Sequence, residues 1–177
     1  MTYLFWTKQQ WEDWFNKNRS LLLVILSALS VLLILHVMKP YWEISQNPTH
    51  SISKTWFITH WHAIPDRGQL IVFKNPAKNI YPPTFRFVKY LRGLPGDRLE
   101  ILGEKVFVNG KLAALANTPG ADGKPLTPLS FNGIIPPKQY LALGTAPDSF
   151  DSRYADFGLF DEGKILGTGY AWPFGPE

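Results

Sequence analysis

Residues 84–97 read TFRFVKYLRGLPGD, a β-rich run that ends in a turn and carries a lysine in its middle. Side chains alternate between the two faces of a strand, so Phe85, Phe87, Lys89 and Leu91 share one face, and the other carries two arginines. The arginines mark the wetter face, which places Lys89 on the buried one. Burial lowers the pKa of a lysine, and a neutral amine can act as a general base. The alternative is a lysine whose amine snorkels to the strand edge.

Short β-rich segments separated by Gly and Pro clusters fill the chain beyond residue 39. The sequence Asn109-Gly110, between VFV and KLA, predicts a two-residue hairpin. Residues 117–137, rich in Pro, are expected to form a long loop or an insertion. The predicted fold class is mainly β, a compact antiparallel domain behind one N-terminal helix. The expected strands are 69–73, 84–91, 98–102, 105–108 and 139–143.

Residues 20–38, SLLLVILSALSVLLILHVM, contain no Asp, Glu, Lys or Arg. As a helix they would be roughly 28 Å long, close to the hydrocarbon thickness of a bilayer. A buried core helix and a cleaved signal peptide are the alternatives. The run is longer than a usual signal core, and its only small-x-small site lies inside it. We therefore predict an uncleaved transmembrane anchor.

The domain organisation predicted from this anchor has three parts. Residues 1–19 form a cytoplasmic or interfacial segment, residues 20–38 span the membrane, and residues 39–177 form a periplasmic, β-rich domain. Basic residues are more frequent before the span than just after it, which favours an N-terminus inside the bacterial inner membrane. Within residues 1–19, a short interfacial helix and a loose tail are both compatible with the sequence; the helix would place on one face Leu4, Trp11, Trp14 and Phe15.

The composition excludes several classes of chemistry. The chain has no cysteine, so disulfides, thiolate catalysis and Cys-type metal sites are ruled out. The net charge of +4 comes without a basic run, so nucleic-acid binding is not expected. His50 and the run His60-Trp61-His62 lack the carboxylate pattern of a metal site. We expect no metal and no cofactor.

The run from Lys89 to Asp97, KYLRGLPGD, closely resembles the lysine box of type I signal peptidases, K-x-x-x-G-x-P-G-D. In that family the first lysine is the general base of a Ser-Lys dyad. The resemblance therefore implies that Lys89 is the base.

A second segment, residues 47–53 (NPTHSIS), resembles the serine box of the branch that matures conjugative pilins, the TraF-type peptidases, with the pattern N-x-T-x-S-I-P. The resemblance implies that Ser51 is the nucleophile and that the Thr49 hydroxyl and the Ser51 backbone form the oxyanion hole. Ser53 stands where the family usually has proline, and it is a rival nucleophile. His50 as the base of a Ser-His enzyme is another alternative.

A third segment, residues 147–154 (PDSFDSRY), resembles the last box of the family, whose core is D-S-R-Y. It implies that Ser149 orients the lysine amine and that Asp151 and Arg153 form a supporting ion pair. Thr145-Ala146-Pro147 stands where the housekeeping enzymes carry a polar run, which again favours the conjugative branch.

Together the three boxes imply a membrane-anchored serine endopeptidase that removes leader peptides from exported precursors, with a conjugative pilin as the expected substrate. The product would be either linear or cyclised. A general signal peptidase and a non-catalytic component of the transfer apparatus are the alternatives. The expected partners are a membrane-embedded precursor and the lipid bilayer.

Overall fold

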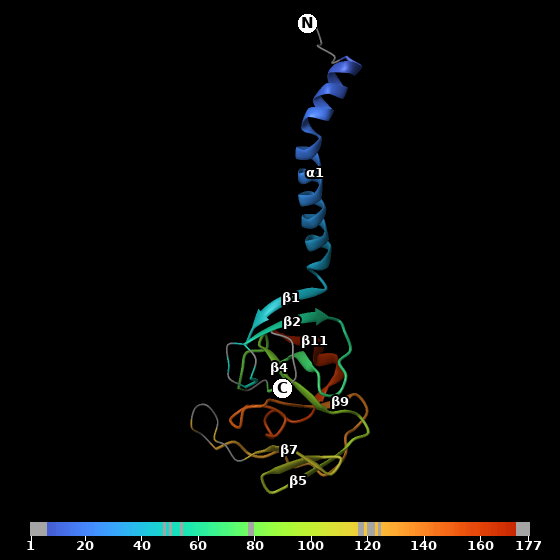
Figure 1. The fold of residues 1–177 in the computed structure, drawn as a ribbon. Coiled ribbons are helices and arrows are strands. Elements are labelled where there is room, and N and C mark those ends of the chain that lie inside the picture. The colour runs from blue at the N-terminus through green and yellow to red at the C-terminus, as the bar shows by residue number, and fades with distance from the viewer. Residues whose placement is uncertain are drawn as a thin grey trace. The chain divides into compact units, whose positions relative to one another are not determined.

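A computed structural model describes residues 7–47, 49, 51–53, 55–77, 80–116, 119, 123 and 125–172. By their internal contacts the chain divides into two compact units, with the boundary between Pro40 and Tyr41. The first unit holds the helix and the second holds the strands, which form two antiparallel sheets (Figure 1).

The helix α1 extends without a break from Lys8 to Met38. It begins at a capping box, in which the Thr7 side chain accepts a hydrogen bond from the backbone N–H of Gln10 and the Gln10 side chain accepts one from the N–H of Thr7. Among the described residues it is the one helix long and apolar enough to cross a membrane, and none of its side chains is buried. Residues 8–19 are thus the first turns of the same helix, not a separate short helix or a loose tail.

The larger sheet has seven strands in the order β1-β2-β11-β3-β4-β9-β10. Every pairing in it is antiparallel, and β4 lies between β3 and β9 near its centre. The strands are β1 (Trp42–Gln46), β2 (Trp56–Trp61), β3 (Leu70–Lys74), β4 (Arg86–Gly93), β9 (Gln139–Leu143), β10 (Phe160–Asp161) and β11 (Ile165–Trp172), with the short 3₁₀ helix η1 (Glu162–Lys164) before the last strand.

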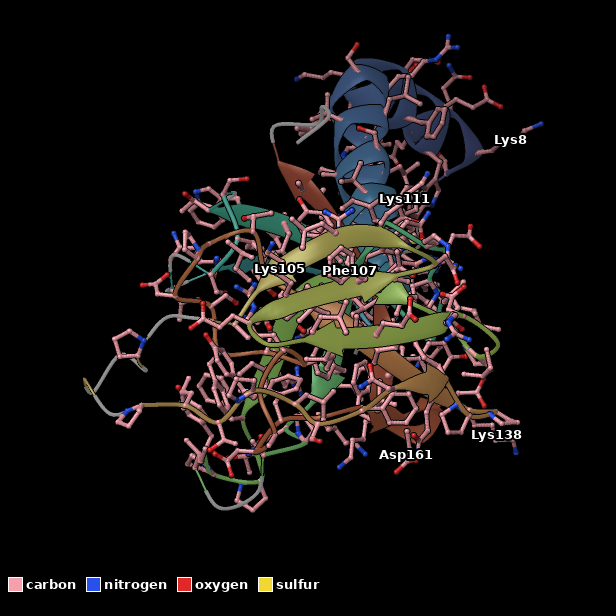
Figure 2. The ribbon with its side chains drawn as sticks, turned by 90° about the horizontal axis from the view of Figure 1, so that it is seen from below. Lys8, Lys105, Phe107, Lys111, Lys138 and Asp161 are labelled. Carbon is pink, nitrogen blue, oxygen red and sulfur yellow. The ribbon has the colours of Figure 1, made fainter. Side chains whose placement is uncertain are left out.

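The smaller sheet has four strands in the order β7-β6-β5-β8. Its strands are β5 (Arg98–Leu102), β6 (Lys105–Val108), β7 (Lys111–Leu115) and β8 (Gly133–Ile134). The predicted turn joins β6 to β7, with Asn109 and Gly110 both at positive φ (51° and 75°), as a two-residue hairpin requires. Figure 2 shows this sheet from below, with β7 along one edge.

Two large apolar clusters form most of the core. One is rich in phenylalanine and packs on β3 and β4, and the other joins the small sheet to β9. A smaller third cluster contains Ile52, Leu70 and Tyr90. The expected buried face of β4 is confirmed, since Lys89 and Leu91 are both buried. The opposite face of β4 is less exposed than expected: Arg86 on it is exposed, but Tyr90 is buried in the third cluster.

The expected strands all occur, with boundaries shifted by up to two residues. The sequence did not predict β1, β2, β8, β10 or β11. Within residues 117–137, the expected loop or insertion, the described part contains only the two-residue strand β8. The mainly β, antiparallel fold class is correct.

Candidate active site

Lys89 lies in the middle of β4 and is almost completely buried, with 2% of its surface exposed. Burial lowers the pKa of its amine from 10.5 to about 8; Asp151 and Asp148 oppose this shift, and Arg153 adds to it. The amine Nζ donates a hydrogen bond of 2.7 Å to the hydroxyl of Ser149. Close to neutral pH this lysine can therefore exist as a neutral amine whose direction is set by a serine.

The turn that holds Ser149 is fixed by a buried ion pair between Asp151 and Arg153. All five guanidinium hydrogen bonds of Arg153 are made within the protein. Two reach the carboxylate of Asp151, and three reach backbone carbonyl oxygens, including those of Gly144 and Pro147. The same carboxylate accepts the backbone N–H of Gly144 at 2.7 Å. The pair therefore holds the whole turn that follows β9.

Ser51 lies in the segment between β1 and β2, and its backbone binds that same turn. Its carbonyl oxygen accepts hydrogen bonds from the backbone N–H groups of Thr145 (3.0 Å) and Ala146 (3.3 Å). Two residues later, the N–H of Ser53 donates to the Thr145 hydroxyl at 3.1 Å. A proline at position 53 could not donate this bond, so Ser53 and Thr145, two residues that differ from the family pattern, contact one another.

Gly144 lies between the two halves of the site. A Cβ atom on this glycine would overlap the Ser149 hydroxyl on one side and the Ser51 carbonyl oxygen on the other, and it would lie only 2.7 Å from the Ser149 Cβ. The close approach of these two residues therefore requires a glycine at position 144. Through this contact Ser51 is brought beside the Ser149–Lys89 pair, although 37 residues of sequence separate Ser51 from Lys89.

The hydroxyl of Ser51 is hydrogen bonded to Thr49, with 3.0 Å between the two oxygen atoms. Thr49 in turn donates its own hydroxyl to the side-chain oxygen of Asn47 at 2.8 Å. Since that hydroxyl has one proton, Ser51 is the donor in its bond to Thr49. Within the described part of the chain, no hydrogen bond joins Ser51 directly to Lys89.

Comparison of the sequence with known protein families identifies one family. A model of the signal peptidase family, peptidase S26, matches residues 16–172. This chain belongs to that family. It is a serine endopeptidase of the signal peptidase type, with an N-terminal helix suited to anchor it in a membrane.

Three relatives illustrate the similarity. A probable signal peptidase I-2 of Synechocystis is 27% identical over 173 residues, which cover 92% of this chain and 75% of the relative. A signal peptidase I of Bacillus licheniformis is 27% identical over 171 residues, covering 86% and 88%. A crystal structure of a signal peptidase I from Enterococcus faecalis has 24% sequence identity and a TM-score of 0.39, covering 59% of this chain and 96% of that one.

Sequence reasoning missed two parts of this S26 site. One is Asn47, whose amide also donates to the carbonyl of Ile52 at 3.4 Å and so bridges the segment that carries Ser51. The other is the ion pair of Arg67 with Asp97, which lies at the end of the lysine box. Asp97 is the last residue of the lysine-box pattern, but nothing in the sequence identified a partner 30 residues away.

Burial alone would raise the pKa of Asp97, but hydrogen bonds lower it below its usual value. They come from the Arg67 guanidinium, the backbone N–H of Leu94 and the side chain of Asn109. Because Asn109 belongs to the β6–β7 hairpin, this carboxylate connects the end of β4 to the small sheet.

The other histidines and Ser53 complete the set of candidates that the sequence offered. His50 lies outside the described residues. His60 stacks on Trp42, with 4.2 Å between the ring centroids, and His62 follows β2 at a positive φ of 64°. Ser53 is exposed, and its backbone N–H donates to the Thr145 hydroxyl. Among the described residues, no basic side chain is hydrogen bonded to the Ser53 hydroxyl.

Proposed function

We propose that Ser51 and Lys89 are the catalytic dyad of this endopeptidase. The observation that carries the proposal is that one turn, residues 144–149, binds both halves: its backbone N–H groups hold the Ser51 carbonyl, and its serine hydroxyl accepts the lysine amine. A serine hydroxyl is a weak nucleophile until a neighbouring base removes its proton. The lowered pKa of Lys89, about 8, provides such a base near neutral pH.

The reaction starts with a rotation of the Ser51 hydroxyl away from Thr49. In the structure its proton points to Thr49, so the hydroxyl turns toward Lys89 before attack. Such rearrangements are common, because catalytic hydrogen bonds often tighten only when substrate binds. The Ser51 oxygen then bonds to the carbonyl carbon of the scissile peptide, and Lys89 accepts the proton.

The tetrahedral oxyanion is stabilised by the backbone N–H of Ser51 and by the hydroxyl of Thr49. To donate to the oxyanion, the Thr49 hydroxyl leaves Asn47, which accepts it in the resting structure. A single donor of this kind contributes about 3–4 kcal/mol to catalysis in other enzymes. The C–N bond then breaks, and Lys89 returns its proton to the leaving amine.

The ester left on Ser51 reacts with water, whose proton passes through Lys89 back to the Ser51 oxygen. If an amine attacks in place of water, the product is a peptide bond, and a chain whose own N-terminus attacks becomes cyclic. Asp151 and Arg153 take no part in bond making. They support the turn that aims Ser149 at Lys89.

We infer a single-pass protein with residues 20–38 in the inner membrane, residues 1–19 on the cytoplasmic side and residues 39–177 in the periplasm. The apolar helix and the excess of basic residues before it support this orientation. Only twelve residues link Met38 to Ser51 in the sequence, so the length of the chain limits how far the nucleophile can lie from the membrane in which precursor leaders are embedded. The lipid bilayer is thus a structural partner.

The substrate we propose is a conjugative pilin precursor. The segment that carries Thr49 and Ser51, and the replacement of the polar run before Ser149 by Thr145 and Ala146, support the TraF-type branch. A general signal peptidase acting on many secreted precursors is the second candidate. It is favoured by the relatives, which are named signal peptidase I.

The test is co-expression of the full chain with pilin precursors and with ordinary secreted precursors. Ser51→Ala and Lys89→Met should abolish processing, with a loss of about 10³-fold or more. Ser53→Ala is the matched control and should process normally. Processing that survives in both dyad variants, or that is lost in Ser53→Ala, would show that the proposed dyad is wrong. The mass of the mature product separates the outcomes of the reaction, since a cyclic pilin is one water lighter than a linear one.

A further inference from the structure

A groove of about 800 Å³ extends from the turn that holds Ser51 along the edge of the small sheet. We call it the basic groove. Gly144 and Thr145 line one end, β7 lines one wall, and the cationic side chains that line it include Arg67, Arg92 and Lys111. Because Thr145 donates its backbone N–H to Ser51 at 3.0 Å, this end of the groove lies next to the nucleophile.

The groove is positively charged. No Asp or Glu is among its described lining residues. Asp97 pairs with Arg67, and Asp151 pairs with the buried Arg153 at the groove floor, so these two arginines are largely neutralised. The guanidinium of Arg92 lies 5.0 Å from the ring centroid of Tyr90. Lys111 is exposed, and within the described part of the chain no carboxylate pairs with it, so its charge favours an anionic ligand.

The wall formed by β7 is an edge strand of the described sheet, since among the described strands β7 pairs with β6 alone. Edge strands bind extended peptides through their backbone groups. The carbonyl of Leu115 is already bonded to Arg153, so residues 111–114 remain. Four residues of strand extend over about 13 Å, enough for about four residues of bound peptide.

We propose that the basic groove binds the precursor just after the cleavage site and favours acidic residues there. This inference rests on the proposed function. A leader has an apolar core, a basic start and small residues at the cleavage site, and neither its apolar nor its basic part suits a positively charged groove. The polar segment on the other side of the scissile bond does suit it.

The binding test uses the full-length Ser51→Ala protein in neutral detergent micelles, so that no cleavage is needed. Three fluorescent peptides share one small-residue cleavage site. The first has acidic residues at the second to fourth positions after it, the second has lysines there, and the third has the acidic residues before it. We expect the first to bind about tenfold more tightly than the other two, with a preference that weakens as salt is added.

The variant Lys111→Glu should weaken binding of the first peptide by about fivefold and improve binding of the second. Lys105→Glu is the matched control. Lys105 is an exposed lysine of the same sheet that does not line the groove, and Figure 2 shows it toward the other end of the β6–β7 hairpin from Lys111. It should leave both affinities unchanged.

Equal dissociation constants for all three peptides would overturn the proposal, as would equal effects of the two lysine variants. The cleavage assay tests the dyad separately from the groove. If wild-type protein binds the first peptide preferentially but Ser51→Ala cleaves as fast as wild type, the dyad is wrong and the groove stands. If wild type cleaves all three peptides equally well and binds them equally, the dyad stands and the groove is refuted.

Discussion

Replacing Lys89 by methionine should inactivate the enzyme and at the same time stabilise its fold. Methionine fills a similar volume and has no charge to bury. In the folded wild type the amine has a pKa of about 8, against 10.5 for an unperturbed lysine. Below pH 8 the folded protein therefore holds a buried charge that the unfolded chain would carry in water at no cost.

The size of the effect follows from that shift. A difference of about 2.5 pH units corresponds to about 3 kcal/mol of lost stability in the wild type below pH 8. The variant leaves the Ser149 hydroxyl without its lysine partner, which costs about 1 kcal/mol. We expect Lys89→Met to be more stable than wild type by about 2 kcal/mol at pH 6.5.

The pH dependence is the distinctive part of this prediction. Between pH 8 and 10.5 the unfolded chain binds more protons at this lysine than the folded one does, so wild-type stability rises with pH and the advantage of the variant disappears. Above pH 10.5 wild type should be equal or slightly more stable.

The assay is urea unfolding of the full chain in detergent micelles, followed by near-ultraviolet circular dichroism at pH 6.5, 8 and 10.5. Lys105→Met, a change at an exposed lysine, is the control and should show no such trend. A wild type that is the more stable protein at pH 6.5, or a difference independent of pH, would refute the buried-amine interpretation.

Three further outcomes are expected. The kcat/KM of wild type for a precursor peptide should rise with pH through about 8, because only the neutral Lys89 amine accepts a proton; a flat profile between pH 6 and 10 would contradict this. Gly144→Ala should lower kcat by about 100-fold at unchanged near-ultraviolet dichroism, since its Cβ overlaps both halves of the site, whereas Gly163→Ala, with open space around it, should be active. Asp97→Asn should lose about 2 kcal/mol of stability at pH 7 through its weakened bond to Arg67, and this difference should shrink as acid protonates the wild-type carboxyl.

The sequence predicted the parts of this molecule whose signal is local. The charge-free run 20–38 is long enough to be recognised by itself, and the Asn109-Gly110 turn has a backbone conformation that few other residue pairs adopt. The alternation of side chains along β4 placed Lys89 on the buried face, and the structure decides for burial over a snorkelling amine.

The parts that could not be predicted depend on contacts between distant segments. The strand β11 contains Gly167 and Gly169, which resemble turn residues in a sequence. In the structure a Cβ at Gly167 would overlap the backbone of His60, so the glycine is there because β2 packs closely against it. Tyr90 is buried on the face that carries Arg86 because Ile52 and Leu70 cover it, and Ile52 comes from the segment after the nucleophile.

The position of β11 in the large sheet has a consequence for the newly made chain. This strand lies between β2 and β3 and pairs with both. It therefore joins the β1–β2 pair, which is synthesised more than 100 residues earlier, to the rest of the sheet. A lone two-stranded hairpin is at best marginally stable in water. Lys89 lies on β4 between β3 and β9, all of which precede β11, but the β1–β2 pair that flanks Ser51 gains its third strand only when β11 is synthesised. We therefore expect the segment that carries the nucleophile to be the part of the site that becomes ordered last.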